Sequence, residues 1–455
     1  MHAVRRWVLC AVVALAPMRG HTDGVATVGG SPRAIGRAGA ATVGDDGGGA
    51  LLINPAAIAR RDSVRVELGA TSIEDSVEWQ SDSAAAPRSL GRAGSRTAPL
   101  GAVIGALGGW IIGVGAMTAA VVERSLPKPA DDTSDPSGNY DDRYEYRYTG
   151  ISGSYRRDTL TIGAARRIGD SLALGLALGA SRVRIAEHRR IWAGVGIAHP
   201  IGSAADDVDL ALSGSDPFTM NAVAGVLYAP VDSPIELGAS LGWAQHVRVT
   251  GAAQAVGTAM GPNIVEPCTP RAALTVKQPV VVRAGGRYVG DRVVGEIDGD
   301  LWIPPRGSQA TGWALDGIRV VDPSQLALDL RWLPSRIAQR THFAVRGALD
   351  VALVPGFLWA IGGYAFSTRP TPPSRMSPSF GDLGGHTLGL GFETTASGVT
   401  ITVGWSRTWS TASQVASELR LDGPFYGGDS PVPQGVYDGS IDQAGGLVEA
   451  ELGGR

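Results

Sequence analysis

The sequence predicts an all-β fold, a transmembrane antiparallel up-and-down β-barrel of about fourteen strands. Three observations support this prediction: apolar residues recur at every second position, short turns alternate with long polar stretches, and glycine is abundant. The 64 glycines among 455 residues, without a collagen-like repeat, disfavour a helical protein. The 43 acidic residues nearly balance the 40 Lys and Arg, which leaves no basic face for nucleic acid.

The first twenty residues indicate export. Arg5 and Arg6 precede the apolar run 7–16, which is too short to span a bilayer as a helix but suits a secretory signal. We therefore expect residues 1–20 to be a signal peptide, and the cleavage site stays open. The chain has two cysteines, too few for a disulfide framework or a thiolate metal cluster.

Alternation of apolar and polar residues marks the expected strands. In segment 235–250, for example, Leu237 and Leu241 alternate with Glu236 and Ser240, as in a strand with one oily and one wet face. The polar face often carries glycine or a charge, which a soluble sandwich core would not tolerate but a water-filled lumen would. The same alternation occurs in segments 64–71, 343–351, 387–393 and 399–408.

Short turns and long polar stretches alternate along the chain. The turn signals are Gly108-Gly109, Gly169-Asp170, Asp232-Ser233-Pro234, Gly290-Asp291, Pro355-Gly356 and Ser397-Gly398. The long stretches are roughly 74–96, 123–143, 192–216, 251–273, 304–339, 369–384 and 413–437. This order is typical of an outer-membrane barrel with short periplasmic turns and long outer loops.

The segment 97–122 allows two interpretations. It contains no charge and is long enough for a transmembrane helix. Pro99, the glycines and the turn at Gly108-Gly109 favour a β-hairpin instead. Because both faces of this hairpin are apolar, we expect a greasy lumen beside it.

The segments 36–46 and 51–58 resemble the N-terminal hatch of the FadL/TodX family of outer-membrane transporters for hydrophobic compounds. The stretches 279–300 and 362–391 are also similar to that family. The resemblance implies that a hatch of residues 21–62 plugs a barrel of residues 63–455. The hatch motif would comprise Asp45, Asp46, Asn54, Pro55 and Ala56; an ordinary Asn-Pro turn is the alternative for its second half.

The same resemblance implies a function. We expect passive uptake of hydrophobic small molecules, such as long-chain fatty acids or hydrocarbons, with lateral release in the bacterial outer membrane. The implied partners are the ligand and outer-membrane lipid, and we expect a monomer without a cofactor. The alternatives are a barrel that scaffolds partners at the cell surface or in secretion, and a porin for polar solutes. Gly113 and Gly115 either form the lateral exit or make room for the hatch.

Four charged residues are expected to face the lumen together. With Gly290-Asp291 as a two-residue turn, Arg283 lies opposite Asp298, and Arg287 lies diagonal to Glu296. We interpret them as a charge ladder that holds the shape of the barrel.

The remaining motifs favour no catalytic chemistry. The segment 238–242 matches G-x-S-x-G, but Ser240 is expected in the middle of a strand rather than at a strand-turn-helix elbow, so we predict no enzyme. The seven histidines show no metal-ligand spacing, and we expect no metal. Acidic residues in 131–142 fit either Ca²⁺ ligands or a solvated loop. Lipopolysaccharide phosphates or solvent are the expected partners of Arg182, Arg184, Arg189 and Arg190.

Overall fold

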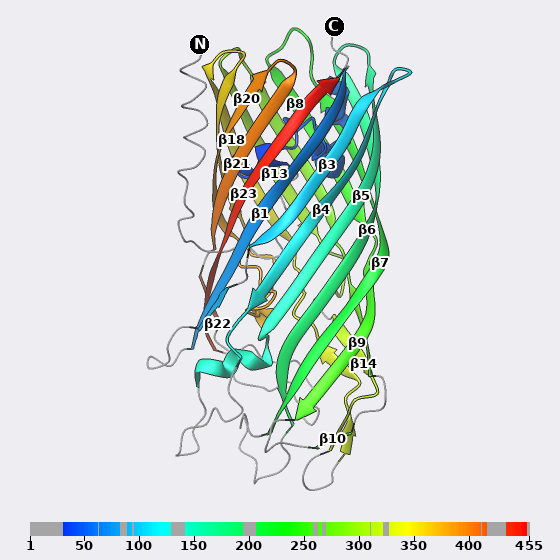
Figure 1. Ribbon diagram of the computed structural model, residues 1–455, viewed down its shortest axis with the longest axis vertical. Coiled ribbons are helices and arrows are strands. Elements are labelled where there is room, and N and C mark those ends of the chain that lie inside the picture. Colours follow the sequence, from blue (N-terminus) through cyan, green and yellow to red (C-terminus); the bar gives the residue numbers. More distant parts are fainter. Residues whose placement is uncertain are drawn as a thin grey trace.

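The computed structural model describes the chain from Ser31 to Leu452 with gaps (Figure 1). The described residues are 31–61, 63–81, 89–92, 95–128, 142–193, 206–257, 263–265, 270–309, 311–321, 327–410, 412–415 and 434–452. The predicted signal peptide, the hatch residues 21–30 and the acidic residues 131–141 lie outside the described residues.

Three short helical pieces precede the first strand, and 3-10 turns recur in the loops. The helices are α2 (Pro32–Gly36), α3 (Ala50–Ile53), η1 (Pro55–Arg60), η2 (Asp142–Tyr148) and η4 (Pro373–Arg375). The strands of the first half are β1 (Val64–Ser81), β2 (Ser89–Arg92), β3 (Arg96–Leu107), β4 (Trp110–Ser125), β5 (Ser152–Ile168), β6 (Leu172–Trp192), β7 (Asp207–Tyr228), β8 (Ile235–Ala244), β9 (Val247–Gly257) and β10 (Asn263–Val265). Those of the second half are β11 (Arg271–Val276), β12 (Val280–Val289), β13 (Val293–Ile303), β14 (Gly312–Asp316), β15 (Arg319–Val321), β16 (Ala327–Asp329), β17 (Trp332–Pro334), β18 (His342–Val354), β19 (Leu358–Ser367), β20 (Gly385–Ala396), β21 (Val399–Ser410), β22 (Ser413–Val415) and β23 (Gly435–Leu452).

The strands form one closed antiparallel barrel, which confirms the predicted fold (Figure 1). The first strand, β1, pairs with the last, β23, along its whole length, from Val64 opposite Leu452 to Ser81 opposite Gly435. Segments β2–β3, β8–β9, β11–β12, β13–β14, β17–β18 and β21–β22 each continue one another along the wall. Counted in this way, the described part of the chain contributes fourteen wall strands.

The uncharged segment 97–122 lies within the hairpin β3–β4, whose strands pair from Leu100 opposite Met117 to Leu107 opposite Trp110. The hairpin interpretation is therefore confirmed. Within the described ranges, no helix is both long and apolar enough to cross a membrane. A separate small sheet of β10, β15 and β16 lies outside the wall.

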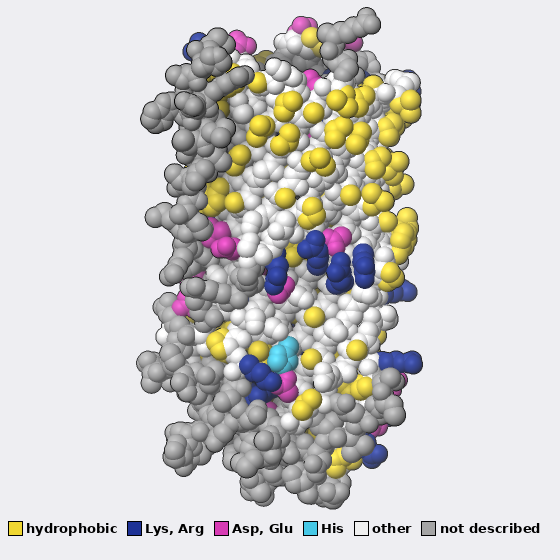
Figure 2. Space-filling model, in the orientation of Figure 1, with side chains coloured by type: hydrophobic (Ala, Val, Ile, Leu, Met, Phe, Trp, Pro, Cys, Tyr) yellow, Lys and Arg dark blue, Asp and Glu magenta, His cyan; other side chains and the backbone are white. Residues whose placement is uncertain are grey.

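The outer face of the wall is apolar over the half of the barrel nearest the short turns. Figure 2 shows hydrophobic side chains gathered there, above a row of basic side chains at mid-height. On β6, for example, Leu174, Leu176 and Leu178 are exposed, whereas the alternate residues Ala173 and Ala177 are buried. An apolar outer band is what a membrane-spanning barrel requires.

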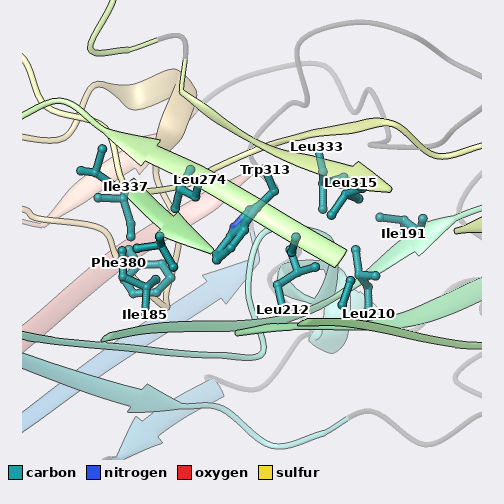
Figure 3. Packing of buried hydrophobic residues seen from close by; sticks show 14 of the residues in the cluster. Ile185, Ile191, Leu210, Leu212, Leu274, Trp313, Leu315, Leu333, Ile337 and Phe380 are labelled. Atoms are coloured by element: carbon teal, nitrogen blue, oxygen red, sulfur yellow. The ribbon is translucent and has the colours of Figure 1, made fainter. Parts of the chain in front are cut away.

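An apolar core fills the inside of the barrel toward the long loops (Figure 3). Side chains of inward-facing strand positions, such as Ile185 and Leu212, pack there against Leu274 and Phe380. Trp313 of β14 is fully buried in this cluster, and its indole N–H donates to Glu187 Oε2 at 2.8 Å. We call this cluster the outer core. It lies in the barrel beyond the level of the hatch.

Candidate functional site

The hatch crosses the lumen near the turn end of the barrel (Figure 1). Its helix α2 contacts β20, β21 and β23, whereas η1 contacts β5, β6 and β7. The Ser31 hydroxyl caps α2 by accepting from the N–H of Ala34 at 3.2 Å, and Pro32 occupies the first turn. None of the three helical pieces exceeds six residues. Helices this short are marginal alone, so the hatch depends on its contacts with the wall.

Two wall carboxylates of β13 hold the hatch backbone. Asp298 Oδ2 accepts from the N–H groups of residues 41 and 42 at 2.7 and 2.8 Å. Glu296 Oε1 accepts from those of residues 43 and 44 at 2.8 and 2.9 Å. A Cβ atom on Gly44 would lie 2.2 Å from Glu296 Oε2. Glycine is therefore required for the carboxylate to approach the backbone.

A third carboxylate repeats this arrangement on β1. Glu67 Oε2 accepts from the N–H of Gly48 at 2.7 Å, and a Cβ atom on Gly47 would lie 2.4 Å from Glu67 Oε1. These hatch residues have no ladder to join, so the wall acids take the place of strand partners. The glycine-rich composition of the hatch follows from this close approach.

Arg37 neutralises the wall acids from the hatch side. Its Nη1 donates to Glu296 Oε2 at 2.9 Å, and its Nε donates to Asp350 Oδ1 at 3.0 Å. Arg33 adds an ion pair to Asp350 at 3.2 Å. Buried charges are tolerated only when they are paired in this way.

The Asn54 side chain ties the hatch together. Its Oδ1 accepts from the N–H of Ala56 at 3.3 Å and so caps η1. Its Nδ2 donates to the carbonyl oxygens of Thr42 at 2.9 Å and Val226 at 3.2 Å, the latter on the wall strand β7. The Asn-Pro-Ala sequence therefore links two parts of the hatch to the wall.

Two wall glycines make room for this motif. A Cβ atom on Gly225 would lie 2.0 Å from Asn54 Oδ1, and one on Gly175 would lie 2.3 Å from the backbone nitrogen of Ala56. A larger residue at either position would displace the Asn-Pro-Ala turn. These are close-approach glycines of the kind found where another backbone meets a strand.

The acidic pair lies at a different part of the wall from the Asn-Pro-Ala turn, beside β1. Burial raises the pKa of Asp45, whose carboxylate accepts from Gly47 N–H at 3.2 Å and from Ser31 Oγ at 3.1 Å. Burial would also raise the pKa of Asp46, but the nearby arginines outweigh it and hold that pKa below its usual range. The Asp46 carboxylate accepts from Arg61 Nε at 2.9 Å.

The predicted pairing of the charge ladder is wrong. Arg283 lies opposite Asp300 rather than Asp298, and Arg287 lies directly opposite Glu296. The backbone N–H of Gly290 bonds to the carbonyl of Val293, so Asp291 and Arg292 form the turn. Moving a two-residue turn by one position shifts the register by two residues and leaves every side chain on its predicted face.

The roles within the ladder also differ from the prediction. Glu296 and Asp298 bind the hatch, and Arg287 Nη1 pairs with Glu236 Oε2 at 3.2 Å. Arg283 Nε lies 3.7 Å from Asp300 Oδ2. The charge ladder of these four residues therefore holds the hatch in place in addition to pairing charges along the wall.

A cavity of about 390 Å³ lies between the hatch and the outer core. Its surface is mixed rather than uniformly greasy. Hatch residues such as Leu52 line it together with Arg157 and Trp302, and the Trp302 ring stacks on that of His342 with centroids 4.6 Å apart. The other charged lining residues include Arg283, Asp300, Arg346 and Asp382.

The fold of this chain matches solved structures over nearly its full length. A FadL homologue from Pseudomonas aeruginosa aligns over 95% of this chain and 99% of its own, with a TM-score of 0.66 and 13% identity. The toluene transporter TodX of P. putida aligns over 93% and 99%, with a TM-score of 0.67 and 12% identity. The toluene transporter TbuX of Ralstonia pickettii gives 93% and 98%, a TM-score of 0.62 and 13% identity.

The chain has the FadL/TodX fold. No protein-family profile matches the sequence. No curated protein is similar to it in sequence.

Within this FadL/TodX barrel, Gly113 and Gly115 face the hatch. Added Cβ atoms would lie 3.0 Å from Leu51 Cδ2 at Gly113 and 3.2 Å from Leu51 Cδ1 at Gly115. The ladder beside them is continuous on both sides, toward β3 and toward β5. Leu51 also packs with Ile104 and Ile111 in one buried cluster, so the hatch fills the greasy space predicted there.

A break in the wall lies elsewhere, between β8–β9 and β11–β12. Pairing stops at Gly242 opposite Val281 and resumes at Val247 opposite Val276. Pro279 lies in this break and has no N–H to give to a ladder. We call the two facing segments, 243–246 and 277–280, the window.

The window borders both the cavity and the outer face of the FadL/TodX barrel. Trp243 lines the cavity and is 50% exposed on the outer face. Ala244, Gln278 and Pro279 also line the cavity. The N–H of Gln278 donates to His246 Nδ1 at 3.3 Å across the break.

The remaining sequence predictions have mixed outcomes. Ser240 lies within β8, and its hydroxyl donates to the hatch carbonyl of Ile53 at 2.5 Å, so it is a hatch contact. Arg182 and Arg184 are exposed, whereas Arg189 and Arg190 are fully buried in ion pairs and do not face a membrane surface. Sequence reasoning missed the role of Arg37 because the hatch has no periodicity to show which wall residues that side chain contacts.

Proposed function

We propose that this protein carries small hydrophobic molecules, such as long-chain fatty acids or hydrocarbons, passively across the bacterial outer membrane. The observation that carries the proposal is the cavity between hatch and outer core. A space of about 390 Å³, lined by aromatic and aliphatic side chains together with a few charged ones, is in the range of small-molecule sites. The FadL/TodX fold supports it, since the matched structures include two described as toluene transporters.

We propose further that the solute leaves sideways. The hatch lies across the turn end of the lumen, and the wall carboxylates hold its backbone. A direct route through the hatch to the turn end would therefore require breaking these hydrogen bonds. The window offers a shorter route, because Trp243 borders both the cavity and the outer face. A hydrophobic solute leaving there would enter lipid without crossing water.

Arg157 supports an amphipathic acid as one substrate class. It lines the cavity, where its Nε donates to Ser181 Oγ at 3.0 Å and its Nη1 lies 3.5 Å from Gln278 Oε1. In the described part of the chain it forms no ion pair with a carboxylate. A fatty-acid carboxylate would complete its pairing, whereas a hydrocarbon would not.

The test compares uptake of labelled oleate and of toluene in cells that lack their own transporter. The proposal expects uptake of at least one compound together with low ionic conductance in planar bilayers. Replacing Arg157 by Leu should lower oleate uptake about tenfold, the worth of one charge-assisted hydrogen bond, and leave toluene uptake unchanged. Arg166→Leu, on the exposed turn side of β5, is the matched control.

Two outcomes would contradict the carrier. High conductance with no preference for apolar solutes would indicate a porin. No uptake and no conductance from folded, inserted protein would indicate a scaffold, the remaining alternative. An oleate defect equal in both arginine variants would remove Arg157 from the substrate site and leave the carrier intact.

A further inference from the structure

A group of outward-facing arginines lies at the edge of the apolar band. Figure 2 shows a row of basic side chains along that edge. Arg156 of β5 faces the same side of the sheet as the exposed Leu160, four residues along the strand. Arg182 and Arg184 of β6 likewise face the same side as the exposed Leu178. The three side chains therefore leave the wall on its outer face.

Their height matches a membrane surface. Segment 172–182 spans about 33 Å of extended strand at about 3.3 Å per residue. At a strand tilt of about 40° this is roughly 25 Å along the barrel axis, the usual height of the apolar band. Arg182 thus lies where lipid headgroups begin, on the side of the long loops.

The local charges are not balanced. Arg156 lies directly opposite Arg184 in the register, and like charges in such pairs repel. Asp158 is the shared counter-ion, at 2.9 Å from Arg156 Nε and 3.3 Å from Arg184 Nη2. The side chain of Arg182, directly opposite Asp158 in the register, forms no hydrogen bond or ion pair within the described ranges. The three guanidinium groups therefore have one carboxylate beside them, and it pairs with only two of the three.

We propose that Arg156, Arg182 and Arg184 bind the phosphate groups of a glycolipid of the outer leaflet. Guanidinium forks match phosphate oxygens and can bind them bidentately. Leu160 and Leu178, on the short-turn side of the arginines, give the acyl chains of the same lipid an apolar surface. A lipid phosphate would relieve the repulsion between Arg156 and Arg184, which Asp158 alone does not cancel. This site is independent of transport.

The experiment titrates the purified full-length protein, in neutral detergent, with bisphosphorylated lipid A and counts bound lipid by native mass spectrometry. Parallel titrations use dephosphorylated lipid A and inorganic phosphate. Arg182→Gln/Arg184→Gln should weaken lipid A binding about tenfold or more. Arg166→Gln/Arg292→Gln, two exposed arginines at the turn end, should not change it.

Heat-modified gel migration establishes that each variant is folded. Arg182→Lys/Arg184→Lys keeps the charge without the fork, and it should bind with intermediate affinity and serves if the Gln variant fails to fold. Equal affinity of parent and variants, or equal binding of the dephosphorylated lipid, would overturn the site. Displacement of lipid A by millimolar phosphate would show an anion site without a lipid preference and would overturn the choice of ligand.

Discussion

At the scale of single residues, the hatch is held by hydrogen bonds between two kinds of polar group, each of which would be costly to bury without a partner. The hatch backbone offers N–H groups that belong to no ladder, and the lumen wall offers carboxylates that would be costly without partners. Glu296 satisfies both needs, because it accepts from residues 43 and 44 and pairs with Arg37. Removing either member leaves the other buried and unsatisfied.

Glu296→Gln is therefore expected to loosen the hatch. The amide keeps one acceptor but loses the charge that strengthens the bonds to the backbone and to Arg37, at a cost of about 2 kcal/mol. The measurement is thermal unfolding of the folded barrel, followed by limited proteolysis at the hatch. Glu74→Gln, an exposed position on β1, is the control and should change neither. Unaltered proteolysis in Glu296→Gln would show that the remaining anchors suffice.

The acidic pair should give the hatch a pH dependence with two opposite parts. Asp46 has a lowered pKa, so its stabilisation is present above its ordinary pKa of about 4 and is lost as pH falls. Asp45 has a raised pKa, so its ionised form opposes the folded hatch as pH rises. Asp46→Asn should lower the unfolding temperature at pH 7 and flatten the acid dependence, whereas Asp45→Asn should raise that temperature slightly. Unfolding temperatures between pH 3 and 8 check this, and parallel shifts in both variants would contradict it.

At the scale of elements, the hatch is a set of short pieces that only the barrel can order. Its helices are below the length that is stable in water, and its ends contact different parts of the wall through α2 and η1. Such an element can leave as a unit when its wall contacts are broken. The strands around it are long and, away from the window, paired along their length, so they would persist without it.

Deleting the hatch tests whether it closes the lumen. Removal of residues 21–62 after an intact signal peptide should turn a nearly closed barrel into one with large, steady single-channel conductance. The full-length chain carrying Glu74→Gln serves as the folded reference. Equal conductance with and without the segment would mean that the hatch does not obstruct the pathway for ions.

Two places in the wall are candidates for the exit of the solute, the window and the β3–β4 hairpin with Gly113 and Gly115, and substitutions at the two places should have different effects. Ala244→Trp places a large side chain at the cavity side of the window and should reduce hydrocarbon uptake about tenfold. Gly113→Val/Gly115→Val should instead push on Leu51 and disturb the hatch, raising conductance without blocking uptake. Uptake and conductance of folded, inserted protein distinguish them. Loss of uptake in Gly113→Val/Gly115→Val, with normal uptake in Ala244→Trp, would show that the solute leaves at the β3–β4 hairpin.

At the scale of the whole molecule, the two-residue alternation of apolar and polar side chains predicted the wall, because it shows which face of each strand points outward and which points into the lumen. The turns at Gly108-Gly109 and Gly169-Asp170 then set the alternation of short and long connections. The register at β12–β13 was predicted two residues off, because sequence does not show which two residues make a turn. The hydrogen bond between Gly48 and Glu67 could not be predicted either, because the hatch has no periodic pattern that would show which wall residue faces each hatch residue.

The barrel has two closures in series, the hatch toward the turns and the outer core toward the loops, with the cavity between them. Trp313→Ala should open the outer one, because it removes a fully buried side chain from the outer core at a cost of about 3–5 kcal/mol. We expect a lower unfolding temperature and faster entry of external hydrocarbon, without added ionic conductance while the hatch stays in place. Trp332→Ala, on an exposed side chain of β17, is the matched control. A rise in conductance would show that the hatch alone does not close the lumen. Slower uptake by folded Trp313→Ala would show that the outer core helps to capture the solute rather than delaying its entry.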